Sequence, residues 1–401
     1  MEKAPEIILC KIGWRTNTQR IPLGNRCWLR IAATIIAIFF SLGGDVHAEV
    51  FNTEHYRLKV TTVVDGLDSP WGLAFLPDGN MIVTERPGSI RIVTPTGKIG
   101  PRLSGTPEVY DLNQGGMLDV AVDPAFSINN FIYFSYAEPG LGGGGTAVAR
   151  ARLVVTGNRL DDVKVIFRQT PKSHGGRHFG SRLVFSRDGN LFITVGERGQ
   201  RDRAQNFTIN RGNVVRIRPD GSVPLNNPFV NKTPYRPEVW SYGHRNPQGA
   251  ALHPESGHLW IHEHGAMGGD EVNIPLPGRN YGWPVIAYGL HYSGEKIGVG
   301  THKNGMEQPI YYWDPSIAPS GMAFYTGDAF PKWRGNLFVG ALKFRLLVRL
   351  TLEGETVIAE ERLLQGLGER IRDVRQGPDG LIYLLIDSSD GRILRLSPAP
   401  S

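Results

Sequence analysis

Short apolar runs recur along the chain from residue 71 onward, each followed by a polar turn and a second apolar run. The turns contain Asp, Pro or Gly, as in Pro77-Asp78-Gly79 and Pro378-Asp379-Gly380. Apolar runs joined by such turns predict pairs of antiparallel strands. The pattern gives six pairs: residues 71–75 with 81–85, 117–122 with 131–134, 183–185 with 191–193, 250–254 with 259–261, 322–324 with 336–339, and 374–376 with 381–384.

The repetition of one strand pair indicates the architecture. Six units between residues 49 and 401 leave room for about four strands and their loops in each unit. Such a repeat is typical of a β-propeller, whereas a β-sandwich, the alternative, needs no repeat. We therefore predict an all-β, six-bladed β-propeller with four antiparallel strands per blade. A closing strand is expected from residues 386–396 or from residues 56–64.

Composition supports a single β domain over residues 49–401. The chain has 50 glycines and 28 prolines, and no stretch after residue 50 keeps a helical spacing of apolar residues for more than a few turns. All-β folds of this length commonly form one domain.

Residues 1–48 have the layout of a secretory leader. Arg26 and Arg30 precede an apolar run over residues 31–42, and a small residue, Ala48, ends the segment. The run is short for a membrane span of about 20 residues. We expect cleavage after Ala48 and export, with an uncleaved anchor as the alternative. Both cysteines, Cys10 and Cys27, lie in this leader, so the mature chain has no thiol for disulfides, metal ligation or catalysis.

The formal charge argues against nucleic acid as a partner. The chain contains 44 Lys and Arg against 38 Asp and Glu, a net charge of +6. The basic residues are scattered rather than clustered on one segment, and a nucleic-acid surface needs a basic patch.

A histidine and a glutamate flank the third strand pair. His178 precedes the first strand and Glu197 follows the second, with the Asp188-Gly189 turn between them. Because antiparallel strands return the chain to the end it left, the two side chains should meet. A histidine oriented by a carboxylate is a candidate general base, although such a pair also occurs as plain structure.

The same argument places polar residues of all six units on one face. The first strand of each unit starts, and the second ends, at that face. The polar residues at these positions are Glu85, Gln114, His178, Arg182, Glu197, Arg245, Asn246, Glu263, His264, Ser320, Lys343, Arg370, Arg372 and Asp387. The cations among them predict a ligand with several acidic groups, unless they form salt bridges between blades.

Residues 263–273 form an acidic, glycine-rich loop after a strand. Asp270, Glu271 and backbone carbonyls are oxygen donors of the kind calcium prefers, although a solvated acidic turn has the same composition. Zinc is disfavoured, because His262 and His264 have no third ligand in view. The aromatic clusters 281–284 and 311–313 favour packing between blades over a sugar-binding floor.

At this point the motifs resemble a known family, the soluble quinoprotein glucose/sorbosone dehydrogenases, and most of all its periplasmic aldose sugar dehydrogenases. The resemblance covers residues 55–397 and includes seven motifs in order. They are Gln114-Gly115-Gly116, His178-x-Gly-x-Arg182-Leu183 with Glu197, Gly243-His244-Arg245-Asn246-Pro247, Glu263-His264-Gly265 with Asp270-Glu271-x-Asn273, Asn280-Tyr281-Gly282-Trp283-Pro284, Ala318-Pro319-Ser320, and Arg370-x-Arg372-Asp373.

The resemblance implies a periplasmic propeller that binds pyrroloquinoline quinone (PQQ) and calcium and oxidises aldoses to lactones. It implies that His178 is the base, that Glu197 orients it and that Arg245 polarises the quinone. Cofactor-binding positions are matched by Gln114, Arg245, Asn246, Ser316, Lys343, Arg370 and Arg372. Calcium positions are matched by the carbonyls of Gly265 and Ala266, and by Asp270, Glu271 and Tyr281 at a further site that supports dimers in some members.

Three residues depart from the family pattern. Glu197 stands where some relatives have Asp, and Ser316 stands near a position that is threonine in others. Arg177 occupies a position that is acidic in glucose-specific members, so we expect broad aldose use. The electron acceptor stays open, as does the choice between a monomer and a homodimer. A calcium-dependent lactonase and a non-catalytic glycan-binding propeller are the alternative functions, but neither uses both the cations and the His178–Glu197 pair.

Overall fold

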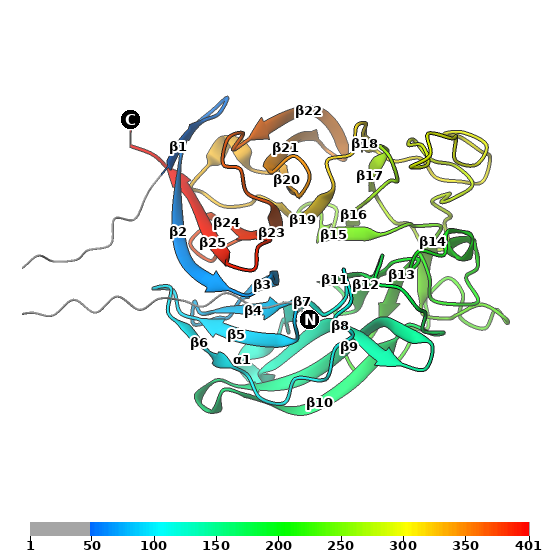
Figure 1. Cartoon of the computed structure of the whole chain (residues 1–401), viewed down its shortest axis with the longest axis horizontal. Coiled ribbons are helices and arrows are strands. Elements are labelled where there is room, and N and C mark those ends of the chain that lie inside the picture. Colours follow the sequence, from blue (N-terminus) through cyan, green and yellow to red (C-terminus); the bar gives the residue numbers. More distant parts are fainter. Residues whose placement is uncertain (1–48, 401) are drawn as a thin grey trace, which may run out of the picture. The chain divides into compact units, whose positions relative to one another are not determined.

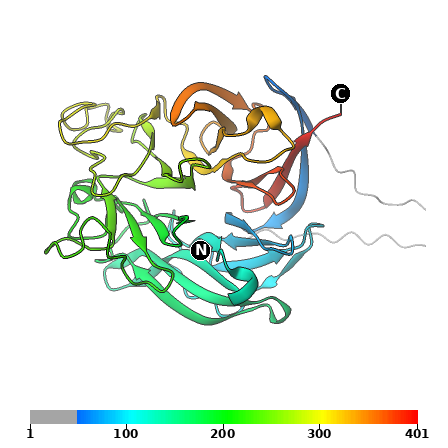
Figure 2. The same ribbon diagram turned by 180° about the vertical axis from the view of Figure 1, so that it is seen from behind.

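The computed structural model describes residues 49–400, and they form a six-bladed β-propeller (Figures 1 and 2). The predicted leader lies outside these residues. Each blade is a sheet of four antiparallel strands, and the sixth blade carries one extra strand. The predicted fold class is therefore confirmed. Within residues 49–400, no helix is long and apolar enough to cross a membrane.

Blades 1 to 3 follow one another along the chain. Blade 1 consists of β3 (Pro70–Phe75), β4 (Met81–Glu85), β5 (Ser89–Val93) and β6 (Ile99–Arg102). Blade 2 consists of β7 (Met117–Val122), β8 (Phe131–Gly140), β9 (Gly143–Val154) and β10 (Arg159–Arg168). Blade 3 consists of β11 (Gly180–Phe185), β12 (Leu191–Val195), β13 (Asn213–Ile217) and β14 (Val239–Tyr242).

Blades 4 and 5 have the same strand order. Blade 4 consists of β15 (Pro247–Leu252), β16 (Leu259–Glu263), β17 (Asp270–Asn273) and β18 (Tyr311–Trp313). Blade 5 consists of β19 (Pro319–Phe324), β20 (Leu337–Ala341), β21 (Leu346–Glu353) and β22 (Thr356–Leu363). The helical segments are short: α1 (Phe126–Asn129) and the 3₁₀ turns Val155–Gly157, Arg201–Gln205 and Pro331–Trp333.

Blade 6 closes the ring with strands from both ends of the described chain. It consists of β23 (Ile371–Gln376), β24 (Ile382–Ile386), β25 (Gly391–Pro398) and β2 (Arg57–Leu67), with β1 (Glu49–Asn52) outside β2. The segments expected as alternatives for the closing strand pair with each other, for example Val60 with Leu396. Pairing of strands from both ends of the described chain within one sheet holds the ring of blades closed.

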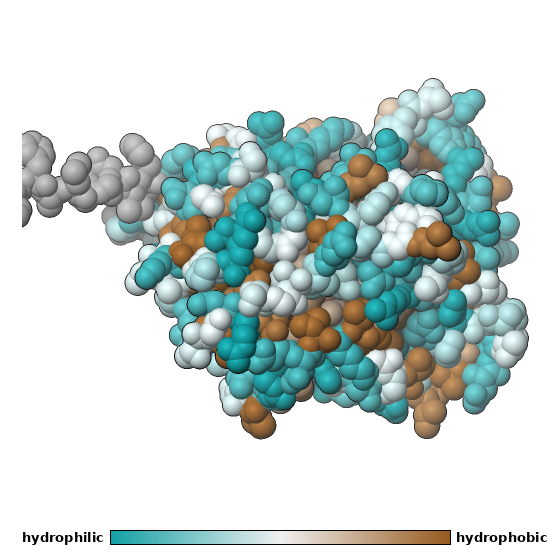
Figure 3. All heavy atoms as spheres, turned by 60° about the horizontal axis from the view of Figure 1, so that its bottom comes forward, coloured by the Kyte–Doolittle hydropathy of each residue, from teal (hydrophilic) through white to brown (hydrophobic). Residues whose placement is uncertain are grey.

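The first strand of each blade lies next to the propeller axis. β3, β7, β11, β15, β19 and β23 contact their neighbours in a closed ring. Large apolar side chains such as Trp260, Trp333 and Phe338 fill the space between blades and are fully buried. Polar residues predominate on the surface shown in Figure 3, between small apolar groups.

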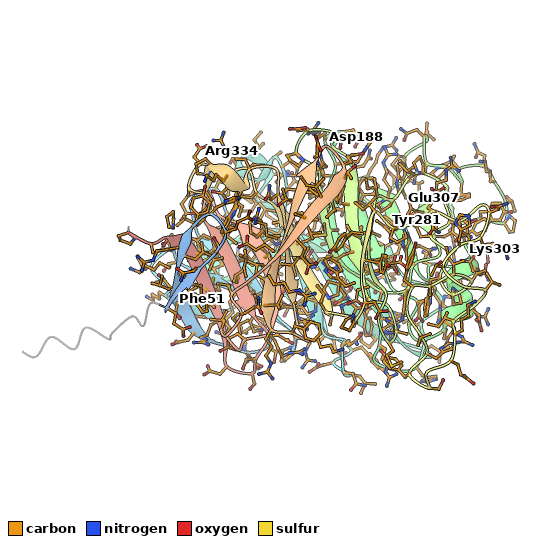
Figure 4. The ribbon with its side chains drawn as sticks, turned by 90° about the horizontal axis from the view of Figure 1, so that it is seen from above. Phe51, Asp188, Tyr281, Lys303, Glu307 and Arg334 are labelled. Atoms are coloured by element: carbon orange, nitrogen blue, oxygen red, sulfur yellow. The ribbon has the colours of Figure 1, made fainter. Side chains whose placement is uncertain are left out.

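The register of every inner strand shifts near its first residue. In blade 1 the pairs Pro70–Glu85 and Gly72–Thr84 flank one unpaired position, and the other five blades have a similar irregularity at the same place. Bulges of this kind re-aim side chains and are frequent beside active sites. We call this end of the propeller the site face. The turns after the inner strands lie at the opposite face, where Figure 4 shows Asp188 and Arg334 at one common edge.

Candidate functional site

The site face contains a cavity of about 600 Å³ around the propeller axis. This volume is within the range of small-molecule sites. All six blades line it, with Trp71, Arg86, Asn113, Gln114, Leu118, Phe179, Gly180, Asn246, Gln248, His264, Ala318, Leu342, Lys343, Arg345, Arg370, Arg372 and Asp387. Five of these side chains are Lys or Arg and one is Asp, so the cavity favours an anionic ligand.

The predicted histidine–carboxylate pair lies beside this cavity. His178 Nδ1 is 2.6 Å from Glu197 Oε1, and both residues are buried. Burial lowers the pKa of His178 below its ordinary value, the hydrogen bond to Glu197 raises it in part, and the charge of Arg245 lowers it. The imidazole is therefore neutral near pH 7. With Nδ1 hydrogen-bonded to the carboxylate, Nε2 is the ring nitrogen that can accept a proton.

The backbone around His178 is held in an unusual conformation. Its φ of 55° lies in the left-handed region, and its amide donates to Gln114 Oε1 at 2.7 Å. Residue 196 must be glycine, because a Cβ on it would lie 2.0 Å from the carbonyl oxygen of His178. Such strain persists where surrounding contacts determine the conformation, and it is frequent at functional sites.

Arg245 and Asn246 connect the dyad to blade 4. The carbonyl of Arg245 accepts a hydrogen bond from the Glu197 amide at 3.0 Å. The Arg245 guanidinium donates to the carbonyl of His264 and lies 5.3 Å from the Trp283 ring. Asn246 lines the cavity, and its Oδ1 accepts from the amide of Gly180. Both side chains are buried, which fixes their positions before any ligand binds.

Blades 5 and 6 supply the predicted cations. Arg370 and Arg372 share Asp387, with guanidinium-to-carboxylate distances of 2.7 and 3.1 Å. Arg372 Nε is buried and has no hydrogen-bond partner, although the side chain lines the cavity. Lys343 is exposed at the cavity wall. A buried donor without a partner is costly, so this wall is suited to a ligand carboxylate.

The acidic loop of blade 4 is organised by Asp270. One carboxylate oxygen accepts from the Gly265 amide at 2.8 Å, and the other accepts from the Ser316 hydroxyl and the Ala318 amide. The three bonds fix the Gly265–Ala266 backbone beside Arg245. Asp270 thus has a clear structural role as well as its predicted place at a calcium site.

Glu271 lies beside a second, much smaller cavity. This space of about 20 Å³ is lined by Arg245, Glu263, Gly265, Ala266, Glu271, Tyr281 and their neighbours. Burial raises the pKa of Glu271 to about 8, and the nearby charge of Glu263 adds to the shift. Asn273 Nδ2 donates to Glu271, whereas its Oδ1 is buried without a partner. Crowded carboxylates and an unpaired carbonyl oxygen fit a hard cation.

Tyr281 packs beneath the same loop. Its ring stacks on His244 at 4.7 Å, and its hydroxyl binds the backbone of Ile274 and Leu276. In the described part of the chain, no three His, Cys, Asp or Glu side chains are grouped as metal ligands. A cation here would depend on backbone carbonyls as well as side chains.

Some residues expected on the site face do not reach the cavity. The Ser316 hydroxyl binds Asp270 instead. Arg182 lies deeper along the axis, where Nη1 is 3.1 Å from Asp119 and 3.0 Å from Asp373. Glu85 binds Ser89 and Arg91, and the Ser320 hydroxyl binds the carbonyl of Ile371. Position in the repeat predicts the face of the propeller but not the direction of each side chain.

Other lining residues were not expected from the sequence. Trp71 lies in the cavity wall with Arg182 stacked over its ring at 4.3 Å. Phe179 and Gln248 also line the cavity, next to the predicted His178 and Asn246. The prediction of the site face considered only polar residues, so it did not include Trp71 and Phe179. Gln248 lies at the bulge between Pro247 and Gly249, so strand alternation from Asn246 does not predict its direction.

Comparison with known proteins identifies the family. The family model described as glucose/sorbosone dehydrogenase matches residues 67–395. An aldose sugar dehydrogenase of Escherichia coli (strain K12) is 46% identical over 345 residues, covering 85% of this chain and 93% of that protein. A crystal structure of a glucose dehydrogenase is 52% identical with a TM-score of 0.83, covering 85% of this chain and 99% of that one.

A structure of a PQQ-bound aldose sugar dehydrogenase from Streptomyces coelicolor is 30% identical with a TM-score of 0.71. It covers 85% of this chain and 98% of that chain. The family match extends over all six blades and includes the cavity, the dyad and the acidic loop. The chain therefore belongs to the glucose/sorbosone dehydrogenase family.

Proposed function

We propose that this protein is a PQQ- and calcium-dependent dehydrogenase that oxidises aldoses at the anomeric carbon to lactones. The observation that carries the proposal is the buried His178–Glu197 pair beside a cavity lined by Lys343, Arg370 and Arg372. PQQ is a tricarboxylate, so these cations suit it, and the unpaired Nε of Arg372 supplies a free donor. When bound, PQQ supplies a quinone that accepts a hydride.

The residues of this chain supply the acid–base chemistry and the orientation. Glu197 accepts a hydrogen bond from Nδ1–H of His178. The unprotonated Nε2 is then free to take the proton of the anomeric hydroxyl. Arg245 places a positive charge close to the dyad and stabilises the negative charge that develops during the reaction. Gln114 and Asn246 hold the backbone on both sides of His178, at its amide and at the amide of Gly180.

Calcium is assigned to the blade 4 loop. The carbonyls of Gly265 and Ala266 would be ligands beside Arg245, and Glu271 and Tyr281 border the smaller cavity. Asp270 fixes this loop through its bonds to Gly265, Ser316 and Ala318. Calcium should therefore stabilise the loop and, through Arg245, the arrangement beside the dyad.

The substrate range is proposed to be broad. Arg177, at the position that the resemblance gives as acidic in glucose-specific members, is exposed directly before His178. The leader-like layout of residues 1–48 suggests export, which is tested by the mass of the mature protein. A chain that begins at Glu49 would support cleavage after Ala48, and an intact leader would refute it.

Reconstitution tests the function directly. Apoprotein loaded with PQQ and calcium should reduce an artificial dye with glucose, galactose and maltose, and omission of PQQ should abolish the reaction. Failure to bind PQQ, or binding without any aldose-dependent reduction, would overturn the proposal. Release of acid from a lactone without PQQ would instead support a lactonase.

A further inference from the structure

Glu197 and Arg211 both have buried polar atoms without a hydrogen-bond partner. Glu197 Oε1 binds His178, whereas Oε2 is buried without a hydrogen-bond partner. Arg211 is only 2% exposed, and its Nε and Nη1 also have no partner. Its Nη2 donates to the carbonyl of Pro171 at 3.0 Å, which fixes the direction of the side chain.

The segments that carry Glu197 and Arg211 lie next to each other beyond the end of the β12–β13 ladder. The ladder between β12 and β13 ends at the pair Val195–Asn213. Glu197 follows the end of β12 by two residues, and Arg211 precedes the start of β13 by two residues. The Gln169 side-chain amide also ties the two segments together, because it donates to the carbonyls of Gly196 and Asn210 at 3.0 and 2.6 Å.

The charges around this pair make Glu197 the natural counterion of Arg211. Burial lowers the pKa of Arg211, the charge of Arg203 lowers it further, and the Glu197 carboxylate raises it. No direct ion pair joins Arg211 to any carboxylate in residues 49–400. Buried polar atoms without protein partners take ordered water, so water is the expected link between the guanidinium and Glu197 Oε2.

We propose that Arg211 is a positioning residue that acts on His178 through Glu197. Its charge and its water-mediated hydrogen bond compensate the carboxylate and keep Oε1 directed at His178 Nδ1. The other charged or titratable groups that act on His178 are Arg245, Arg198 and His264. The catalytic meaning of this role rests on the proposed dehydrogenase function, whereas the electrostatic effect on His178 does not.

The test measures the pKa of His178 in the apoprotein by NMR of histidine-labelled samples, with His178→Gln to assign the signal. Arg211→Met removes the charge, so Glu197 becomes a stronger acceptor and the pKa of His178 should rise by about half a unit or more. Arg211→Lys should keep the wild-type value. Arg211→Gln replaces Arg211→Met if the latter does not fold.

Arg216→Met is the matched control. Arg216 is a buried arginine on β13, the strand that Arg211 precedes, but it binds Asp188 and lies opposite Phe192, away from the dyad. Its loss should lower stability without moving the pKa of His178. An unchanged His178 pKa in Arg211→Met, or an equal shift in Arg216→Met, would overturn the proposal.

Turnover provides a second measurement on the PQQ- and calcium-loaded enzyme. The acid limb of kcat/KM should move to higher pH in Arg211→Met and stay in place in Arg216→Met. If the loaded wild-type protein oxidises no aldose, the proposed function fails, but the NMR comparison still decides the role of Arg211.

Discussion

Replacement of Glu197 by Gln tests the dyad most specifically, because it keeps the shape of the side chain and removes its charge. The bond to His178 is 2.6 Å long and is buried, and a hydrogen bond to a charged group contributes about 1.5–3 kcal/mol. This range corresponds to about 10–150-fold in rate if the bond acts only in the transition state. The Gln amide can also donate a hydrogen bond to Nδ1. The neutral imidazole would then carry its proton on Nε2, so Nε2 could no longer accept the proton of the substrate.

Loss of general base catalysis typically costs about 100–10,000-fold. We therefore expect kcat of Glu197→Gln to fall by at least about 100-fold, because the charge and the tautomer are lost together. The carboxylate raises the pKa of His178, so its removal should also move the acid limb to lower pH. Arg211→Met should move the same limb in the opposite direction.

The assay is steady-state dye reduction by the PQQ- and calcium-loaded variant across pH, with PQQ affinity measured separately. PQQ affinity should stay close to that of the wild type, since Glu197 does not line the main cavity. Glu197→Asp, which keeps the charge but shortens the reach, should have an intermediate rate. A kcat of Glu197→Gln within about threefold of wild type would refute the role of the dyad.

Three further predictions follow from the same geometry. Arg372→Met should weaken PQQ binding by about 10–150-fold in equilibrium titrations, because a charged hydrogen bond is lost; unchanged affinity would remove Arg372 from the cofactor site. Gly196→Ala should lower stability by about 1–3 kcal/mol in denaturant unfolding, because its Cβ would meet the His178 carbonyl; wild-type stability would contradict the close contact. The pH profile of wild-type kcat/KM should stay level as the pH falls past about 6.5, the ordinary histidine pKa, because His178 must be neutral to act and its pKa is lowered. A loss of kcat/KM that begins above that pH would contradict the assignment of His178 as the base.

The repeat in the sequence predicts the inner half of each blade because those strands are short, apolar and joined by tight turns. The pair 183–185 with 191–193 lies within β11 and β12. Outer strands such as β22 mix exposed and partly buried positions and carry charges, so the apolar pattern does not mark them. The sequence left two segments, 56–64 and 386–396, as alternatives for the closing strand. Both form strands of blade 6 and pair with each other, so both take part in closure.

The site was predictable where chain direction alone decides the geometry. Antiparallel pairing brings His178 to Glu197, whichever way the neighbouring loops run. Side-chain direction depends on the bulge at the start of each inner strand, which has no clear sequence signal. The bulges lie at Arg182, which turns to Asp119, and at Trp71, which lines the cavity unexpectedly. Ser316 lies before the inner strand of blade 5, and its hydroxyl binds Asp270.

The reductive half-reaction isolates the step that is assigned to His178. Protein loaded with PQQ and calcium is mixed with glucose without an electron acceptor, and the absorbance of the bound quinone is followed in wild type and in His178→Gln. We expect the wild-type quinone to be reduced in proportion to bound PQQ, whereas His178→Gln should bind PQQ but reduce it about 100–10,000-fold more slowly. Equal reduction rates in the two proteins, or no reduction in the loaded wild type, would contradict the role of His178 as the base.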